Sequence, residues 1–223
     1  MTLADDLKRR AAAKALEQVM DGMKLGLGTG STAAHFVALL GEKVAQGLKV
    51  VGVPTSVQTH KQAESLNIPL TTLDETPELD ITIDGADEFD GQMRLIKGGG
   101  GALLREKIVA ASSDRMIVIA DPSKKVDALG AFPLPVEVVT FGAEATSRRL
   151  ARLVQQYRTI QEVAIVLRMT GEAAFITDQG NYIYDCHFGR IDDVEGLAMA
   201  LSTLPGVVDH GIFLNLASEV IYD

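Results

Sequence analysis

The stretch Met23–Thr32, MKLGLGTGST, decides the fold of this chain, because a strand pattern in it runs straight into the start of a helix. Met23–Gly28 is predicted to be a buried strand, and Ser31–Val44 a helix capped near its first two residues. The apolar side chains of this helix recur at the core-facing positions i, i+1, i+4 and i+8, counted from Phe36. A strand, a glycine loop and a helix in this order are typical of an α/β domain.

The same alternation continues through the first 125 residues. Met116–Ala120 is an uninterrupted apolar run, which is typical of a parallel strand covered on both faces. Further strands are predicted at Lys49–Val53 and Ile81–Asp84, with helices at Ser56–Leu66 and Ala102–Ser112. The pattern predicts an α/β fold, with a Rossmann-like, mostly parallel sheet and helices on both faces.

Beyond a boundary near Asp127–Pro135, where Gly and Pro interrupt the pattern, the rhythm changes. Strands are predicted at Val136–Thr140, Glu162–Arg168, Ala173–Thr177, Tyr182–Phe188 and Val207–Phe213, and helices at Ala143–Tyr157 and Asp192–Leu204. This order predicts a smaller antiparallel α+β (ferredoxin-like) subdomain, after which Ala217–Tyr222 returns to the main sheet. The predicted domains are therefore residues 1–128 with 206–223, and residues 129–205.

Composition narrows the class of protein. The chain has 223 residues, of which 47% are hydrophobic, and no apolar run approaches the roughly 18 residues of a membrane span. Its polar, charged N-terminus predicts a cytoplasmic protein. The net charge of −9 argues against nucleic acid or an anionic membrane as partner. Cys186 is the single cysteine, which excludes an internal disulfide framework, and we interpret it as a packing residue.

The glycine loop Gly26–Thr32 has the composition of an anion site. In open α/β sheets ligands bind outside the carboxyl ends of strands, and a helix N-terminus offers unpaired N–H groups. Glycines permit close backbone approach, and the hydroxyls of Ser31 and Thr32 add donors. The alternative is a tight turn with a serine cap.

A dinucleotide site is a competing interpretation of this loop. Gly28, Gly30 and Ala33 match the looser G-x-G-x-x-A pattern. That fingerprint requires an acidic residue about 20 positions later to hold the ribose hydroxyls, and the second strand ends in Val53–Ser56 without one. An oxidoreductase is therefore disfavoured.

Two carboxylates, Asp84 and Asp87, flank Gly85-Ala86 at the carboxyl end of a predicted strand. At such an end they can bind sugar hydroxyls or carry protons between oxygens, or they can merely cap a turn. Lys97 follows, with four glycines after it. Because each glycine has an entropic cost on folding, four together indicate close contact with a ligand, although a flexible loop is the alternative.

Glu106 is the candidate base. The helix Ala102–Ser112 is predicted to bury Leu104, Ile108 and Ala111, which leaves Glu106 on a stripe of small apolar residues. There it would overlook a shielded pocket, partly desolvated and basic enough to take a carbon-bound proton, or it would be a solvated surface residue. Spacing alone leaves both open.

Lys124, after the strand that ends at Ala120, is either a second cation for an anionic ligand or a surface lysine, and Lys8 is a weaker candidate. The four histidines are scattered without ligand spacing. No metal site and no organic cofactor are predicted.

With these residues in view, the chain resembles ribose-5-phosphate isomerase of the A type. The resemblance is carried by an ordered set of motifs that spans nearly the whole chain: Gly26–Ala34, Asp84–Glu88, Ile96–Gly100, Arg105–Lys107, Asp121–Lys124, Phe132–Val138 and Leu204–Val208. It implies interconversion of D-ribose 5-phosphate and D-ribulose 5-phosphate through a cis-enediolate, without metal or cofactor. It also implies a Rossmann-like domain paired with a small α+β domain, as a homodimer or homotetramer.

The resemblance further implies roles for single residues. Glu106 would be the proton acceptor, Asp84 would assist ring opening, and Asp87 would orient or exchange hydroxyl protons. Lys97, with nearby backbone N–H groups, would stabilise the enediolate oxygen. The substrate-binding positions fall on Thr29, Gly30, Ser31, Thr32, Asp84, Gly85, Ala86, Asp87, Lys97, Gly98, Gly99, Gly100 and Lys124.

Two other functions are weighed against this one. A non-catalytic sugar-phosphate sensor would need the phosphate loop but neither Glu106 nor Lys97, and both are present. A related sugar-phosphate deaminase or acyl-carrier transferase is the other, and a deaminase is expected to have a histidine near its carboxylates, which this sequence lacks.

Overall fold

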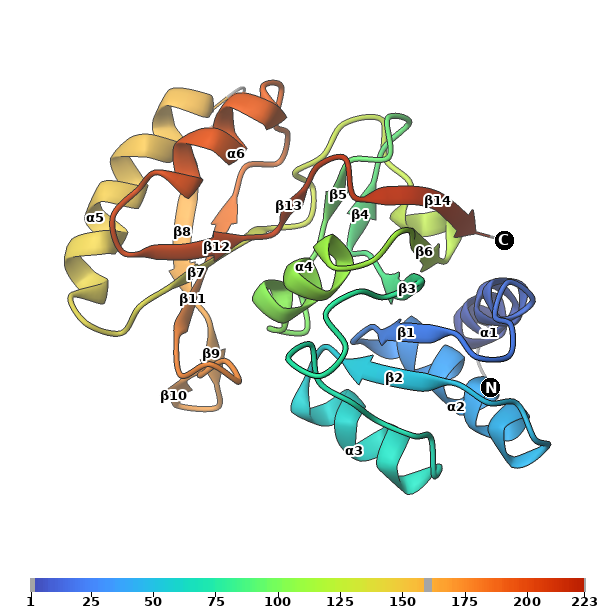
Figure 1. The fold of residues 1–223 in the computed structure, drawn as a ribbon. Helices are drawn as coiled ribbons and strands as arrows, with labels where there is room; N and C mark the ends of the chain where they lie inside the picture. The colour runs from blue at the N-terminus through green and yellow to red at the C-terminus, as the bar shows by residue number, and fades with distance from the viewer. Residues whose placement is uncertain (1–2, 159–161, 223) are drawn as a thin grey trace. The chain divides into compact units, whose positions relative to one another are not determined.

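The computed structural model describes residues 3–158 and 162–222, and the chain forms two compact units (Figure 1). The first unit comprises Met1–Ala86, Arg105–Lys124 and Asn215–Asp223, and the second comprises Asp87–Leu104 and Lys125–Leu214. The predicted domains, whose outermost residues 1, 2 and 223 lie outside the described ranges, stay a prediction.

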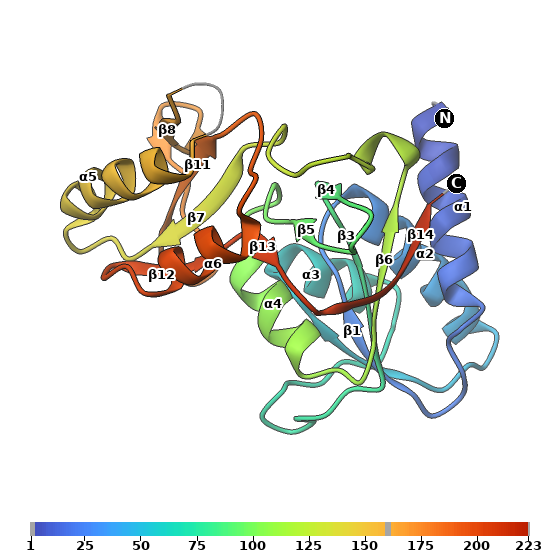
Figure 2. The same cartoon turned by 90° about the horizontal axis from the view of Figure 1, so that it is seen from above.

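The first unit is built on a five-stranded parallel sheet in the order β14-β6-β3-β1-β2. Its strands are β1 (Lys24–Leu27), β2 (Val51–Pro54), β3 (Ile81–Gly85), β6 (Met116–Ala120) and β14 (Ala217–Tyr222). The predicted parallel sheet is confirmed. The return of the C-terminal strand is confirmed as well, because β14, red in Figure 2, pairs with β6.

Helices cover both faces of this sheet, as predicted. They are α1 (Leu3–Leu16), α2 (Ser31–Ala45), α3 (Val57–Ser65) and α4 (Leu103–Ala111), with a short 3₁₀ helix η1 (Pro122–Lys124). Leu25 and Leu27 of β1 point into a cluster with side chains of α1 and α2, among them Phe36. Gly26, between them, points to the other face, where Val109 of α4 lies against it.

The predicted buried face of α4 is wrong. Ile108 is 47% exposed, and Ala111 is exposed too. The buried residues are instead Ala102, Leu103, Glu106, Val109 and Ala110. The helix packs through its smaller side because Gly26 has no side chain: a Cβ there would lie 2.6 Å from Val109 Cγ1.

The second unit contains a four-stranded antiparallel sheet in the order β12-β7-β11-β8. Its elements are β7 (Leu134–Val138), α5 (Ala143–Val154), η2 (Gln155–Tyr157), β8 (Ala164–Leu167), β11 (Tyr182–His187), α6 (Val194–Ser202) and β12 (Val207–His210). This is the β-α-β-β-α-β order of ferredoxin-like folds. Leu150 of α5 and Leu197 of α6 pack with Val136 and Cys186 of the sheet in one core.

Two strand predictions in this unit are wrong in detail. The strand expected at Ala173–Thr177 is a short hairpin of β9 (Met169–Thr170) and β10 (Ala173–Ala174). The strand expected at Val207–Phe213 breaks into β12 and β13 (Ile212–Phe213). The latter pairs with an unpredicted hairpin of β4 (Glu88–Phe89) and β5 (Leu95–Ile96). The break falls at Gly211, where a Cβ would lie 2.2 Å from the carbonyl oxygen of Lys97.

Among residues 3–158 and 162–222, none of the helices combines the length and the hydropathy of a membrane span.

Candidate functional site

The glycine loop of the first unit leads into α2 through Gly30, which is the N-cap with φ 105° and gives no side-chain cap. A side chain is strained at that φ, so glycine is required there although there is room around it. Ser31 is exposed and Thr32 half-buried in the first turn of α2. Lys8, the weaker candidate, donates to Ser31 Oγ at 3.0 Å. The structure therefore adds an ammonium group to the amides and hydroxyls at this helix start.

Beneath the loop lies a cluster of buried hydroxyls that the sequence analysis missed. Thr29 Oγ1 lies 2.7 Å from Thr55 Oγ1, 2.8 Å from Ser56 Oγ and 3.2 Å from Thr59 Oγ1. Thr59 Oγ1 also donates to the Gly28 carbonyl at 2.9 Å. The sequence did contain a signal for this cluster. Two hydroxyl residues follow β2 at the place where a dinucleotide site would have an acidic residue.

Asp84, at the end of β3, is fully buried and fastened to the same loop. Its Oδ1 accepts from the N–H of Thr29 at 3.0 Å and from that of Gly85 at 2.7 Å. A Cβ at Gly28 would lie 2.2 Å from this oxygen, so glycine is required for the approach. Two neighbouring parallel strands thus place a carboxylate and a bare backbone together at their carboxyl ends.

Lys124 follows β6 at the same edge of the sheet, in the last position of η1. Its N–H donates to the Asp121 carbonyl at 3.1 Å, and Asp121 Oδ1 accepts from the N–H of Ser123 at 3.0 Å. This turn sets the half-buried Lys124 just past the strand end. Gly85 and Ala86, also half-buried, continue from β3.

Glu106 lies in the first turn of α4 and is only 3% exposed. The alternative of a solvated surface glutamate is therefore wrong. Its neighbours on the buried face of the helix are the apolar residues already described. A carboxylate in such surroundings is partly desolvated, which is the environment expected of a general base.

The remaining predicted residues belong to the second unit. Lys97 is 3% exposed, with Nζ 5.5 Å from the ring centroid of Phe213. The N–H of Gly99 donates to Asp87 Oδ2 at 2.7 Å, and a Cβ at Gly99 would lie 2.6 Å from Asp87 Oδ1. Gly98 has φ 105°. The structure thus brings Asp87 together with the loop that follows Lys97. Glycine is required in this loop by close contacts and backbone angles, and not by flexibility alone.

Two further side chains contact this loop and were missed. Arg168 donates to the carbonyls of Gly98 and Gly99, and the ring of Phe175 occupies the space where a Cβ of Gly101 would be, 2.4 Å from Cζ. No motif in the sequence marks either residue, because they are some 70 positions away along the chain.

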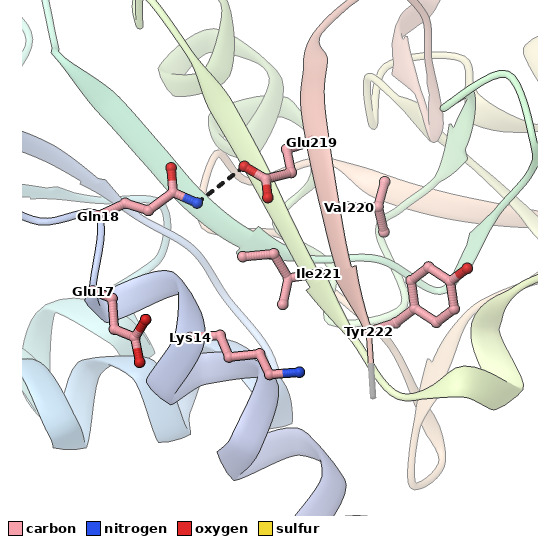
Figure 3. A pocket seen from close by; sticks show the side chains of 7 residues that line it. All are labelled: Lys14, Glu17, Gln18, Glu219, Val220, Ile221 and Tyr222. Carbon is pink, nitrogen blue, oxygen red and sulfur yellow. Dashed lines mark hydrogen bonds between the residues drawn. The ribbon is translucent and has the colours of Figure 1, made fainter.

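A pocket of about 510 Å³ lies beside α1 and β14 of the first unit. Figure 3 shows the side chains that line it. It is lined by Lys14, Glu17, Gln18, Glu219, Val220, Ile221 and Tyr222. Gln18 Nε2 donates to Glu219 Oε2 at 3.0 Å within it. None of the predicted site residues lines this pocket. In the described part of the chain, no group of three or more His, Cys, Asp or Glu is placed to hold a metal ion.

A parallel sheet whose carboxyl edge carries a glycine loop, a buried aspartate and a lysine defines a Rossmann-like α/β protein.

Comparison with known proteins narrows this class. The family model of ribose 5-phosphate isomerase A (phosphoriboisomerase A) matches residues 51–223. The chain is 60% identical over 218 residues to ribose-5-phosphate isomerase A of Parvibaculum lavamentivorans, which covers 98% of this chain and 94% of that protein. It is 61% identical over 219 residues to the protein of that name from Rhodopseudomonas palustris, covering 97% and 93%.

Solved structures that are similar to this chain are ribose-5-phosphate isomerases as well. Ribose 5-phosphate isomerase from Plasmodium falciparum is similar with a TM-score of 0.92 at 42% identity, covering 98% of this chain and 94% of that one. A D-ribose-5-phosphate isomerase in complex with phospho-erythronic acid has a TM-score of 0.91 at 39% identity, covering 99% and 96%. The chain therefore belongs to the ribose-5-phosphate isomerase A family, and the resemblance found in the sequence is confirmed.

Proposed function

We propose that this protein is an aldose–ketose isomerase that interconverts D-ribose 5-phosphate and D-ribulose 5-phosphate. Membership of the family supports the activity. The complex of a related structure with phospho-erythronic acid supports a sugar phosphate as substrate. The single observation that supports the chemistry is a carboxylate, Glu106, buried to 3% exposure on the packed face of a helix.

Glu106 is the proposed proton acceptor. It removes the C2 proton of the open-chain aldose, the C2–H electron pair moves into a C1–C2 double bond, and O1 becomes the enediolate oxygen. The same carboxylic acid returns the proton to C1, while a hydroxyl proton moves between O2 and O1, so atoms and charge balance. A positioned base of this kind contributes about 10²–10⁴ in rate.

Asp84 and Asp87 are the proposed groups for oxygen-bound protons. The two N–H donors on Asp84 Oδ1 keep that carboxylate in one orientation, as opening of the furanose ring requires. Asp87 orients or exchanges the hydroxyl protons. Lys97 and backbone N–H groups of the glycine loop that follows it stabilise the enediolate oxygen. One such donor contributes roughly 3–4 kcal/mol.

The phosphate is proposed to bind at the start of α2 and at Lys124. The exposed start of α2 supports this assignment, because free N–H groups and the positive end of a helix favour an anion. The full set of proposed substrate-binding residues is Thr29, Gly30, Ser31, Thr32, Asp84, Gly85, Ala86, Asp87, Lys97, Gly98, Gly99, Gly100 and Lys124.

The activity is tested by a direct absorbance or coupled assay with ribose 5-phosphate in excess EDTA. We expect turnover in both directions that chelation leaves unchanged. Activity that disappears with EDTA and returns with a divalent cation would contradict a metal-independent mechanism. Absence of turnover in a folded sample would contradict the function.

We also propose a homodimer or homotetramer and a cytoplasmic location. The family resemblance supports the proposed assembly. Light scattering behind size-exclusion chromatography tests the assembly, and a monomer at micromolar concentration would contradict it. Cell fractionation tests the location.

A further inference from the structure

The glycine loop of the second unit is held from behind by one arginine. Arg168, between β8 and β9, donates through Nη1 to the Gly98 carbonyl at 2.7 Å and to the Gly99 carbonyl at 3.2 Å. Two successive peptide groups of the loop are thus fastened to one guanidinium.

Because each peptide group is planar, a hydrogen bond that fixes its C=O also fixes the direction of its N–H. In a trans peptide the C=O of one residue and the N–H of the next point in opposite directions. A fixed Gly98 carbonyl therefore aims the N–H of Gly99 away from Arg168, and that N–H does donate to Asp87 Oδ2 at 2.7 Å. By the same geometry the Gly99 carbonyl aims the N–H of Gly100.

The N–H of Gly100 makes no hydrogen bond with any part of the chain that the structure describes, and Gly100 is exposed. A donor to the carbonyl of a peptide group also polarises that group and strengthens its N–H. The free N–H is thus a fixed and strengthened donor for an external oxygen.

Arg168 is itself immobilised. Its Nε donates to Asp185 Oδ2 at 2.9 Å and its Nη2 to Asp185 Oδ1 at 2.5 Å, a bidentate pair with side chains 15% and 18% exposed. Its guanidinium carbon lies 5.9 Å from the ring centroid of Phe175. Paired and stacked guanidinium groups of this kind keep a defined plane.

We propose that Arg168, held by Asp185, is a positioning residue that directs the Gly100 N–H at the substrate oxygen that becomes negatively charged in the enediolate. This role rests on the proposed function, and nothing in the family resemblance assigns it. Arg168 acts through the backbone and does not touch the substrate.

The test compares Arg168→Ala, Arg168→Lys and the matched control Arg190→Ala, which removes an exposed ion pair with Asp192. We expect Arg168→Ala to lower kcat by about 10-fold or more and to leave KM within about 3-fold, a smaller loss than that of a direct donor. Millimolar guanidinium should restore part of kcat in Arg168→Ala. Arg168→Lys, which lacks the planar fork, should also lose kcat, and Arg190→Ala should behave as wild type.

Wild-type kcat in Arg168→Ala, or in Arg168→Lys, overturns the inference. So does a loss of kcat that parallels a lower melting temperature and that guanidinium does not restore, because that is a structural role. The amide resonance of Gly100 without substrate is the independent readout: it should shift in Arg168→Lys but not in Arg190→Ala, and an unchanged resonance overturns the inference. A folded wild type that does not isomerise ribose 5-phosphate overturns the proposed function instead, and the resonance still tests the loop geometry.

Discussion

Three buried carboxylates differ in what surrounds them. Asp84 accepts backbone N–H groups at the loop of the first unit. Glu137, in β7, accepts from Thr177 Oγ1 at 2.8 Å and from Asn181 Nδ2 at 3.0 Å. Glu106 is 3% exposed and shares the buried face of α4 with apolar residues. Since burial of a carboxylate is unfavourable without compensation, each must be retained for a reason, either structural or chemical.

The substitution Glu106→Gln distinguishes a structural role of this carboxylate from a chemical one. The amide keeps the size of the side chain but cannot accept the C2 proton, so we expect kcat to fall by at least ~10² with little change in KM. Glu137→Gln is the matched control, because it changes an equally buried glutamate of the second unit's core. It should lower the melting temperature while kcat stays close to wild type. Near-normal turnover in Glu106→Gln would refute the assignment.

Cys186 is a free, fully buried cysteine that we interpret as a packing residue. Burial, and secondarily the negative charge of Asp185, raises the pKa of its thiol. A thiol reagent such as dithiobisnitrobenzoate should therefore leave the native protein unlabelled at pH 8 and react with one equivalent per chain in urea. The sign of the linkage follows: folding keeps the thiol neutral, so stability from this residue is complete below the unfolded pKa of about 8.5 and declines above it. Rapid native-state labelling would contradict this.

At the scale of the element, α4 shows how a missing side chain positions a functional helix. The helix bearing Glu106 approaches β1 because Gly26 leaves room for Val109. The contact is reinforced where Ser113 Oγ, just past the helix, donates to the Val109 carbonyl at 2.8 Å and lies 2.6 Å from Thr82 Oγ1 of β3. The end of the helix is thereby tied to the sheet through small and hydroxyl side chains.

Gly26→Ala should displace this helix. The new Cβ would lie 1.9 Å from Thr82 Oγ1 and 2.6 Å from Val109 Cγ1, and overpacking of this kind costs about 1–3 kcal/mol. We expect a lower urea midpoint together with a lower kcat, since Glu106 moves with α4. Gly91→Ala is the control, because a Cβ there has nothing within 4 Å. Equal stability and activity in both variants would contradict the packing argument.

At the scale of the whole molecule, each unit has a hydrophobic core of its own, one under α1 and α2 and one under α5 and α6. The chain passes between the units several times, so neither core is made from one continuous segment. The last strand of the first sheet, β14, follows the whole of the second unit in the sequence. Its pairing with β6 covers an edge that is otherwise an apolar strand.

A chain that stops at Leu214 should therefore fold poorly. Without β14, the fully buried strand β6 becomes an exposed apolar edge, which favours aggregation. We expect insoluble protein or a much lower midpoint in thermal circular dichroism. The control is Glu219→Gln, which keeps the strand and removes an ion pair with Arg115 at 3.6 Å between half-exposed side chains. It should shift the midpoint very little. A truncated chain that melts like the wild type would show that β14 is dispensable.

Elements with a local sequence signal were predicted closely, whereas features that depend on residues distant along the chain were not. The strand Met116–Ala120 was predicted with its observed bounds, and the helix at Ser31 to within one residue, because apolar periodicity is local. The two-residue strands β4 and β5 were missed, since so short a segment has no periodicity of its own. Each end of α4 was predicted to within one residue, but its buried face was wrong, because two apolar stripes were available and Gly26 lies far from the helix along the chain.

By itself, the sequence determined the α/β class, the glycine loops at the strand ends and the family of the protein, because strand and helix periods and glycine spacing are written in consecutive residues. Only the tertiary structure decided that Glu106 is buried, that hydroxyls after β2 and in α3 contact the first loop, and that Arg168 binds the second. These contacts join residues about 25 to 70 positions apart. Their partners are chosen by packing and backbone geometry, which no local pattern records.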